Sequence, residues 1–180
     1  SIAQDIPPLP EGFDIQGHRG ARGLKPENTL PSFEAALDLG VTTLELDMHF
    51  TADGIVVVWH DSAIGRESCY LPEDSPVVLP TPDSLIFGNN PRKISKLNLL
   101  EVQAFICDMN PNESQFPEQN NIATELAGDD YRIPTLRQVF ELVETYSKSD
   151  LKTDEQRDNA SIIRFNIESK RLPNDATAIG

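Results

Sequence analysis

Segments typical of β-strands alternate with segments typical of α-helices along this chain of 180 residues. Strand patterns cover residues 13–17, 43–50, 55–59 and 162–170, and helix patterns begin near residues 29 and 133. Strands that alternate with helices predict an α/β fold with a mostly parallel sheet. Binding sites in such folds collect at the carboxyl ends of the strands. Functional side chains are therefore expected where each strand ends.

Local signals mark the ends of both predicted helices. Asn28 or Thr29 can cap the first helix, and Gly40 stands where a helix stop belongs. Thr135 and Gln138 have the spacing of a capping box for the second helix. Apolar residues follow both starts at helical spacing, so each helix is expected to bury one face.

Two of the strand patterns differ in their periodicity. Residues 43–50 alternate between apolar and polar side chains, which predicts a strand with two different faces. Residues 55–59 are continuously apolar, which predicts a strand buried on both faces of the parallel sheet. Asp53-Gly54, between them, is a turn signal.

Residues 62–130 interrupt the alternation. They are rich in Pro, Asn, Asp and Ser, and their short apolar stretches predict an insertion with one short helix. A second polar stretch, residues 147–159, is expected to be a linker to the last strand. Cys69 and Cys107 could form one disulfide or remain two free thiols, since sequence alone does not show that they are close.

The charge balance excludes some classes of partner. Twenty-nine acidic side chains against 15 basic ones give a net charge of −14. Nucleic acids and anionic membrane surfaces require a basic face, so neither is an expected partner. The longest apolar run, residues 55–59, is far shorter than the roughly 20 residues of a membrane-spanning helix, and no transmembrane segment is predicted.

Each predicted strand ends in polar groups that are costly to bury. In chain order these are His18 and Arg19, Glu45 and Asp47, His60 and Asp61, and Glu168 and Lys170. A parallel fold would bring them to one rim of the sheet.

The carboxylates on that rim indicate a cation site. Glu45 and Asp47 are two residues apart on a strand and therefore share a face, where their mutual repulsion favours a bound cation. Oxygen ligands suit Ca²⁺ or Mg²⁺, and Glu168 is a candidate third ligand. The alternatives are a solvent-exposed strand face and, for Glu168 with Lys170, a plain salt bridge.

Two histidines at strand ends indicate acid–base chemistry. His18 and His60 can divide the roles of base and acid near neutral pH, although either ring can also be structural. His49 is expected on the rim or the surface. Arg19 offers a planar fork for a phosphate or carboxylate, or a partner for one of the many acids.

Together these residues resemble the glycerophosphodiester phosphodiesterase family. The matching stretches are His18-Arg19-Gly20, Pro26-Glu27-Asn28-Thr29, Glu45-Leu46-Asp47, Asp53-Gly54, His60-Asp61 and Ile167-Glu168-Ser169-Lys170. The resemblance is strong over residues 13–68 and moderate over 131–170. The segment between them stands where the family carries a substrate-capping insertion. Ser169 departs from the family, which usually has an apolar residue there.

The resemblance implies a TIM-barrel phosphodiesterase that depends on a divalent ion, Ca²⁺ or Mg²⁺. It implies that the metal is held by Glu45, Asp47 and Glu168. It implies a general base, His18, and a general acid, His60. It also implies that the phosphate is bound by Arg19 and Lys170 and that the site is supported by Glu27 and Asn28. The implied substrate is a small glycerophosphodiester, cleaved to glycerol 3-phosphate and an alcohol.

Two other functions are compatible with the same residues. One is a metal- or phosphate-binding module without turnover, and the other is a phospholipase-D-like or phosphoinositide-cleaving enzyme on the same scaffold. The stretch Pro26-Glu27-Asn28-Thr29 and the long segment after Asp61 favour the glycerophosphodiesterase.

The number of strands sets a limit on the barrel. A (β/α)₈ barrel usually needs about 250 residues, whereas only four strands are predicted here. We therefore expect the first half of a barrel at residues 13–180, after an N-terminal arm at residues 1–12, with the remaining strands supplied by missing C-terminal sequence. Such a half is expected to be unstable and inactive alone. The start at Ser1 and the two cysteines favour a periplasmic or secreted protein, with a trimmed cytoplasmic chain as the alternative.

Overall fold

The computed structural model describes residue 10, residues 12–79 and residues 90–170. Most of the predicted N-terminal arm lies outside these residues. The elements, in chain order, are β1 (Gln16–Gly17), α1 (Leu30–Asp38), β2 (Thr43–Phe50), β3 (Val56–Val58), a 3₁₀ turn (Ile94–Lys96), α2 (Leu99–Val102), α3 (Leu136–Ser147), α4 (Asp154–Ser161) and β4 (Arg164–Ser169). The α/β class is confirmed. Among the described residues, no helix has the length and apolar character needed to cross a membrane.

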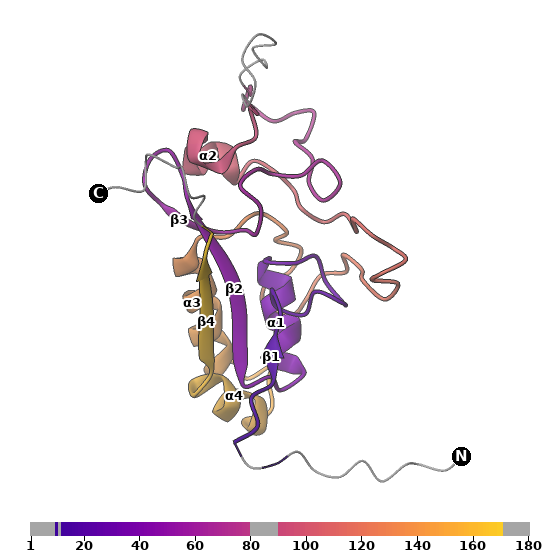
Figure 1. Cartoon of the computed structure of the whole chain (residues 1–180). Coiled ribbons are helices and arrows are strands. Elements are labelled where there is room, and N and C mark those ends of the chain that lie inside the picture. Colours follow the sequence, from indigo (N-terminus) through magenta and orange to yellow (C-terminus); the bar gives the residue numbers. More distant parts are fainter. Residues whose placement is uncertain (1–9, 11, 80–89, 171–180) are drawn as a thin grey trace.

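The sheet is built around β2, which pairs in parallel with β1 on one side and with β4 on the other. Figure 1 shows α1, α3 and α4 on the same side of these strands. Within the described part of the chain, β1 and β4 pair only with β2, so the outer edges of both strands are open. Three parallel strands with helices on one face are the arrangement expected for a segment of an α/β barrel.

The predicted place of residues 55–59 in a parallel sheet is wrong. β3 pairs with β2 in the antiparallel sense, with Met48 opposite Val58. The backbone N–H of Thr51 donates to the carbonyl of Ile55 at 2.9 Å and closes a tight hairpin at Asp53-Gly54. Because a parallel connection needs a crossover of a dozen residues or more, so short a turn forces the antiparallel arrangement. The third parallel strand is β4.

The helix starts follow the capping signals. The Thr29 side chain accepts from the N–H of Ser32 at the start of α1, and Thr135 and Gln138 form the predicted capping box of α3. The linker predicted at residues 147–159 is wrong, because α4 begins within it at a capping box formed by Thr153 and Gln156. This helix buries only Ala160, so its sequence has no apolar stripe to reveal it.

The described residues form two apolar cores. In one core, α1, α3 and α4 pack on the sheet through side chains such as Phe33, Leu46 and Tyr146. The other lies within the segment after β3 and surrounds a disulfide between Cys69 and Cys107. Val57 and Trp59 of the β3 region belong to this second core. The segment between β3 and α3 is therefore a packed unit joined to the sheet through β3.

Candidate functional site

The strand register brings three carboxylates together. Asp47 on β2 lies directly beside Glu168 on β4, and Glu45 precedes Asp47 by two residues on the same face. Ligand oxygens of the three residues lie within 4.8 Å of one another. Asp47 is 1% exposed and Glu45 is 8% exposed, so both of these acidic residues are buried. Buried carboxylates need compensation from hydrogen bonds, cations or a metal.

Lysine and arginine side chains supply part of that compensation. The Lys170 ammonium lies 2.7 Å from Glu168 Oε1 and 3.2 Å from Asp47 Oδ1. Burial alone would lower the pKa of Lys170, but its bonds to these two carboxylates raise it. Arg19 Nε lies 3.4 Å from Asp47 Oδ2. Both salt bridges considered from the sequence are thus formed, and they lie inside the carboxylate cluster.

The loop after β1 holds its functional residues in a rare backbone conformation. Arg19 has φ 54° and Asn28 has φ 56°, in the left-handed region that non-glycine residues seldom occupy. The Asn28 N–H donates to the Arg19 carbonyl at 2.9 Å, and the Arg19 N–H donates to Glu45 Oε2 at 2.8 Å. Gly20 is also left-handed, and a Cβ there would lie 2.6 Å from Ser32 Oγ. Strain of this kind is kept where the surrounding structure needs it.

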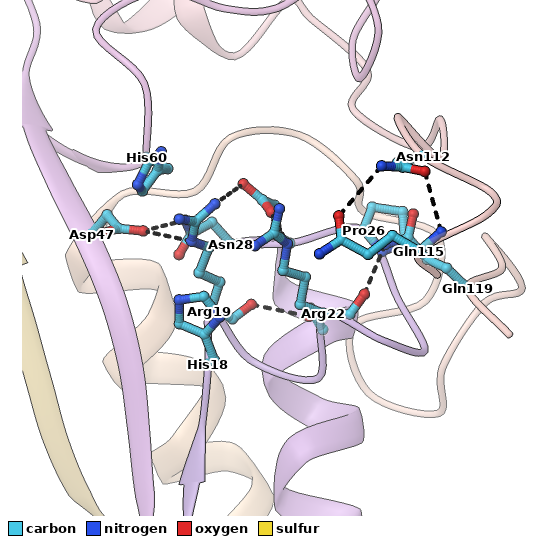
Figure 2. Close-up of polar contacts among 12 residues, drawn as sticks. His18, Arg19, Arg22, Pro26, Asn28, Asp47, His60, Asn112, Gln115 and Gln119 are labelled. Atoms are coloured by element: carbon cyan, nitrogen blue, oxygen red, sulfur yellow. Dashed lines mark hydrogen bonds and ion pairs between the residues drawn. The ribbon is translucent and has the colours of Figure 1, made fainter. Parts of the chain in front are cut away.

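Glu27 and Asn28 contact the other site residues directly. The Asn28 side-chain amide donates to Asp47 Oδ2 at 3.0 Å, and Asn28 is fully buried. Arg19 Nη1 donates to Glu27 Oε1 at 2.8 Å, while Arg22 Nε lies 2.5 Å from the other carboxylate oxygen of Glu27. Figure 2 shows this chain of contacts from Asp47 through Arg19 towards Arg22.

His60 reaches the site by a different route from the predicted one. It follows the antiparallel β3, and the N–H of Trp59 donates to the Asp47 carbonyl at 3.1 Å, which places the next residue beside the carboxylates. The His60 ring lies with Nδ1 2.7 Å from Asp61 Oδ1. His49, expected on the rim or surface, is half-buried and its Nε2 lies 3.0 Å from the His60 carbonyl. A carbonyl can only accept, so this nitrogen of His49 carries the proton.

His18 lies beside the carboxylates from the β1 side. Its Nε2 is 3.9 Å from Glu45 Oε2, and 60% of its side chain is exposed. In Figure 2 the rings of His18 and His60 lie on either side of the contact between Asp47 and Arg19. All the site residues predicted from the sequence are therefore found around one group of strand ends.

His49 and Arg22 also contact the site residues, and neither was given a role from the sequence. His49 shares a strand face with Glu45 and Asp47 and was expected on the rim or the surface. Arg22 has no such signal, because the ring that covers its guanidinium belongs to Phe116, far along the chain.

The three carboxylates fit a hard divalent cation. Their donors are all oxygen, they come from two adjacent strands, and they approach within 4.8 Å of one another. This chemistry matches the ligands that Ca²⁺ and Mg²⁺ take in proteins.

Comparison with known proteins identifies relatives that span far more residues than this chain. The model of the Glycerophosphoryl diester phosphodiesterase family matches residues 18–176. Lysophospholipase D GDPD1 of Rattus norvegicus is 33% identical over 138 residues, which cover 76% of this chain and 35% of that protein. Glycerophosphodiester phosphodiesterase 1 of Bos taurus is 49% identical over 49 residues, 27% of this chain and 15% of that protein. The chain thus matches about a third of the rat relative's length.

Solved structures show the same fold. A Silicibacter pomeroyi protein assigned to the glycerophosphoryl diester phosphodiesterases superposes with a TM-score of 0.63 at 24% identity, over 92% of this chain and 48% of that one. An Oleispira antarctica phosphodiesterase, solved with the product sn-glycerol-3-phosphate, has a TM-score of 0.52 at 23% identity, over 88% and 44%. On the match of the family model to most of its length, the chain belongs to the glycerophosphoryl diester phosphodiesterase family.

Proposed function

We propose that this protein hydrolyses glycerophosphodiesters to glycerol 3-phosphate and an alcohol, with a divalent cation bound. The observation that carries the proposal is the strand register that places Asp47 beside Glu168, with cationic and imidazole groups around them. Family membership supports the same chemistry, and the product in the Oleispira antarctica structure is the one expected here.

Glu45, Asp47 and Glu168 would hold the cation, Ca²⁺ or Mg²⁺. When bound, the ion would supply positive charge to the phosphoryl oxygens. Arg19 and Lys170 bind the same phosphate from the protein side. Both already lie against Asp47, so their charges are fixed before substrate enters. Charge placed in advance stabilises a transition state without reorganisation.

His18 and His60 divide the proton transfers. His18 takes a proton from the attacking hydroxyl, which belongs either to the substrate's glycerol or to water. His60 donates a proton to the departing alkoxide, which is a poor leaving group without one. Because Asp61 contacts His60 Nδ1, Nε2 is the ring nitrogen that donates in this proposal. Glu27 and Asn28 support this arrangement through Arg19 and Asp47.

The proposal is tested by the release of glycerol 3-phosphate from glycerophosphocholine by this chain together with the strands that complete its barrel. We expect release in the presence of Ca²⁺ or Mg²⁺, loss after treatment with a chelator, and recovery when the ion is restored. The double variant Glu45→Ala/Asp47→Ala is the control for adventitious metal. A protein that folds and binds the ion but releases no product would be a metal- or phosphate-binding module instead.

A lysophospholipase D activity is the second candidate. The rat relative that matches 76% of this chain carries that name. Parallel assays with glycerophosphocholine and lysophosphatidylcholine distinguish the two functions. Greater release of choline from the lysophospholipid would favour the second candidate over the first.

Two further features belong to the proposal. The open edges of β1 and β4, with matches to only about half of the related structures, support a barrel completed by strands outside the described residues. The proposed function then belongs to the completed barrel.

The Cys69–Cys107 disulfide supports a periplasmic or secreted location, because disulfides persist in oxidising compartments.

A further inference from the structure

Glu27 is shared between two arginines. Arg19 Nη1 donates to one of its carboxylate oxygens at 2.8 Å, and Arg22 Nε lies 2.5 Å from the other. The side chains of both Arg19 and Glu27 are largely buried, so water screens their attraction poorly. A carboxylate with a single arginine partner would neutralise the positive charge of that arginine more fully than one that is shared. Arg22 therefore limits how strongly Glu27 neutralises Arg19.

Arg22 is held in place by the inserted segment. The Arg22 guanidinium carbon lies 4.7 Å from the centre of the Phe116 ring, within the range of a cation–π interaction. The Gln119 side-chain amide donates to the Arg22 carbonyl at 2.7 Å. The N–H of Asn120 donates to the carbonyl of Leu24 at 3.0 Å, so the two loops are joined along several residues. Figure 2 shows Gln119 and the neighbouring part of the insertion directly beside Arg22.

We propose that Arg22 and Phe116 are positioning residues for the phosphate-binding Arg19. The inference rests on the proposed function, because it takes Arg19 to contact the phosphate. Contact passes from Phe116 to Arg22, from Arg22 to Glu27, and from Glu27 to Arg19. Through these contacts the insertion sets the orientation of Arg19 and how far Glu27 neutralises its positive charge. It therefore affects phosphate binding without touching the phosphate.

The test measures binding of glycerol 3-phosphate by calorimetry and turnover of glycerophosphocholine in parallel, both with the completed barrel. Arg22→Gln is expected to weaken glycerol 3-phosphate binding by about tenfold, the loss of roughly 1.4 kcal/mol. The same variant should raise KM more than it lowers kcat, and should leave Ca²⁺ binding unchanged. Arg22→Lys should recover part of the affinity, because it keeps the charge but not the planar fork.

A pair of substitutions at Phe116 separates cation–π contact from simple packing. Phe116→Leu keeps an apolar side chain but loses the ring, and should weaken glycerol 3-phosphate binding by about two- to fivefold. Phe116→Trp keeps a ring that attracts cations and should bind as well as the wild type. The effects of Arg22→Gln and Phe116→Leu should not add in the double variant, since both break the same chain of contacts.

Arg132→Gln is the matched control, because Arg132 also pairs with a carboxylate, that of Asp130, but contacts none of the site residues. It should bind glycerol 3-phosphate normally. Wild-type affinity in both Arg22→Gln and Phe116→Leu would overturn the inference and leave the proposed function intact. Binding that depends on Arg22, without turnover by the wild-type completed barrel, would overturn the function and support the inference. Wild-type protein that binds no glycerol 3-phosphate would overturn both.

Discussion

Two clusters of acidic side chains around a lysine lie in the described part of the chain, and they differ in how deeply the lysine is buried. In one, the Lys152 ammonium lies 2.7–2.9 Å from Glu34, Asp38 and Glu125. The side chain of Lys152 is 2% exposed and Glu34 is fully buried. In the other, at the strand ends, Lys170 is 22% exposed and Glu168 is 58% exposed.

The partners of Glu34 explain the difference. Its carboxylate accepts the backbone N–H groups of Leu126 and Ala127 as well as the Lys152 ammonium. The Lys152 ammonium and the Glu34 carboxylate are therefore enclosed, whereas Asp38 and Glu125 at the rim of the cluster are 38% and 59% exposed. These contacts fasten the end of the segment between β3 and α3 to α1. The strand-end cluster is open on the side of Glu168 and His18. The same residue types therefore form a structural lock where the central lysine and carboxylate are enclosed by protein, and a proposed ligand site where solvent reaches Lys170 and Glu168.

Removal of the buried carboxylates from the open cluster is expected to have the largest effect. Glu45→Ala/Asp47→Ala should bind no measurable Ca²⁺ or Mg²⁺ by calorimetry, because only Glu168 would remain of the three proposed ligands. Glu34→Ala should disturb folding rather than metal binding. Unchanged ion affinity in the double variant would mean that the metal lies elsewhere.

The histidine variants test the same cluster through turnover. His18→Ala and His60→Ala should each lower kcat by about 10²–10⁴-fold, the usual contribution of acid–base catalysis. His18 is largely exposed, so its variant should melt at the wild-type temperature. Near-normal turnover in either variant would remove that residue from the mechanism.

Lys152→Met tests the cluster around Lys152. It leaves the Glu34 charge buried without its cation, which should cost about 3–5 kcal/mol of unfolding free energy. Lys148→Met is the matched control, since its pair with Glu144 is exposed and is expected to contribute only about 0.3–0.5 kcal/mol. Equal losses in urea unfolding would show that burial of the Lys152 cluster has no energetic consequence.

The smallest expected effect is a dependence of stability on pH. Burial alone would raise the pKa of Glu34, but hydrogen bonds from Lys152, Thr124 and two backbone amides lower it below its ordinary value of 4.5. A carboxyl with a lowered pKa stabilises the fold above its unfolded pKa, and this contribution is lost as pH falls through the folded pKa. Stability of the wild type should therefore decline below pH 4.5.

Lys152→Met removes the ammonium group that stabilises the charged Glu34 carboxylate. Protonation of Glu34 at low pH therefore costs the variant less folding stability than it costs the wild type. The difference in unfolding free energy between wild type and this variant should narrow as pH falls below 4.5. A constant difference across urea titrations at several pH values would contradict the assignment of Glu34 as the coupled group.

Much of the candidate site was predictable because its signals are local. The alternation of β2 put Glu45 and Asp47 on one face, and the register with β4 then placed Glu168 beside Asp47. His60 was correctly expected near them, although the strand that precedes it was predicted to be parallel to β2 and is antiparallel. The turn signal at Asp53-Gly54 is typical of a hairpin with antiparallel strands. The continuous apolar run after it is typical of a buried parallel strand, and the prediction followed that run. The helix α4 was missed because it buries only Ala160, so its sequence has no apolar stripe.

The sequence by itself determined the helix caps, the faces of β2, the turn after it and the family motifs, because each depends on residues a few positions apart. Only the tertiary structure decided the antiparallel course of β3, the disulfide between Cys69 and Cys107, and the contact of Phe116 with Arg22. It also decided that Lys152 is enclosed while Lys170 stays open to solvent. These features depend on which distant segments pack together, and packing follows from the burial of the whole chain rather than from any local pattern.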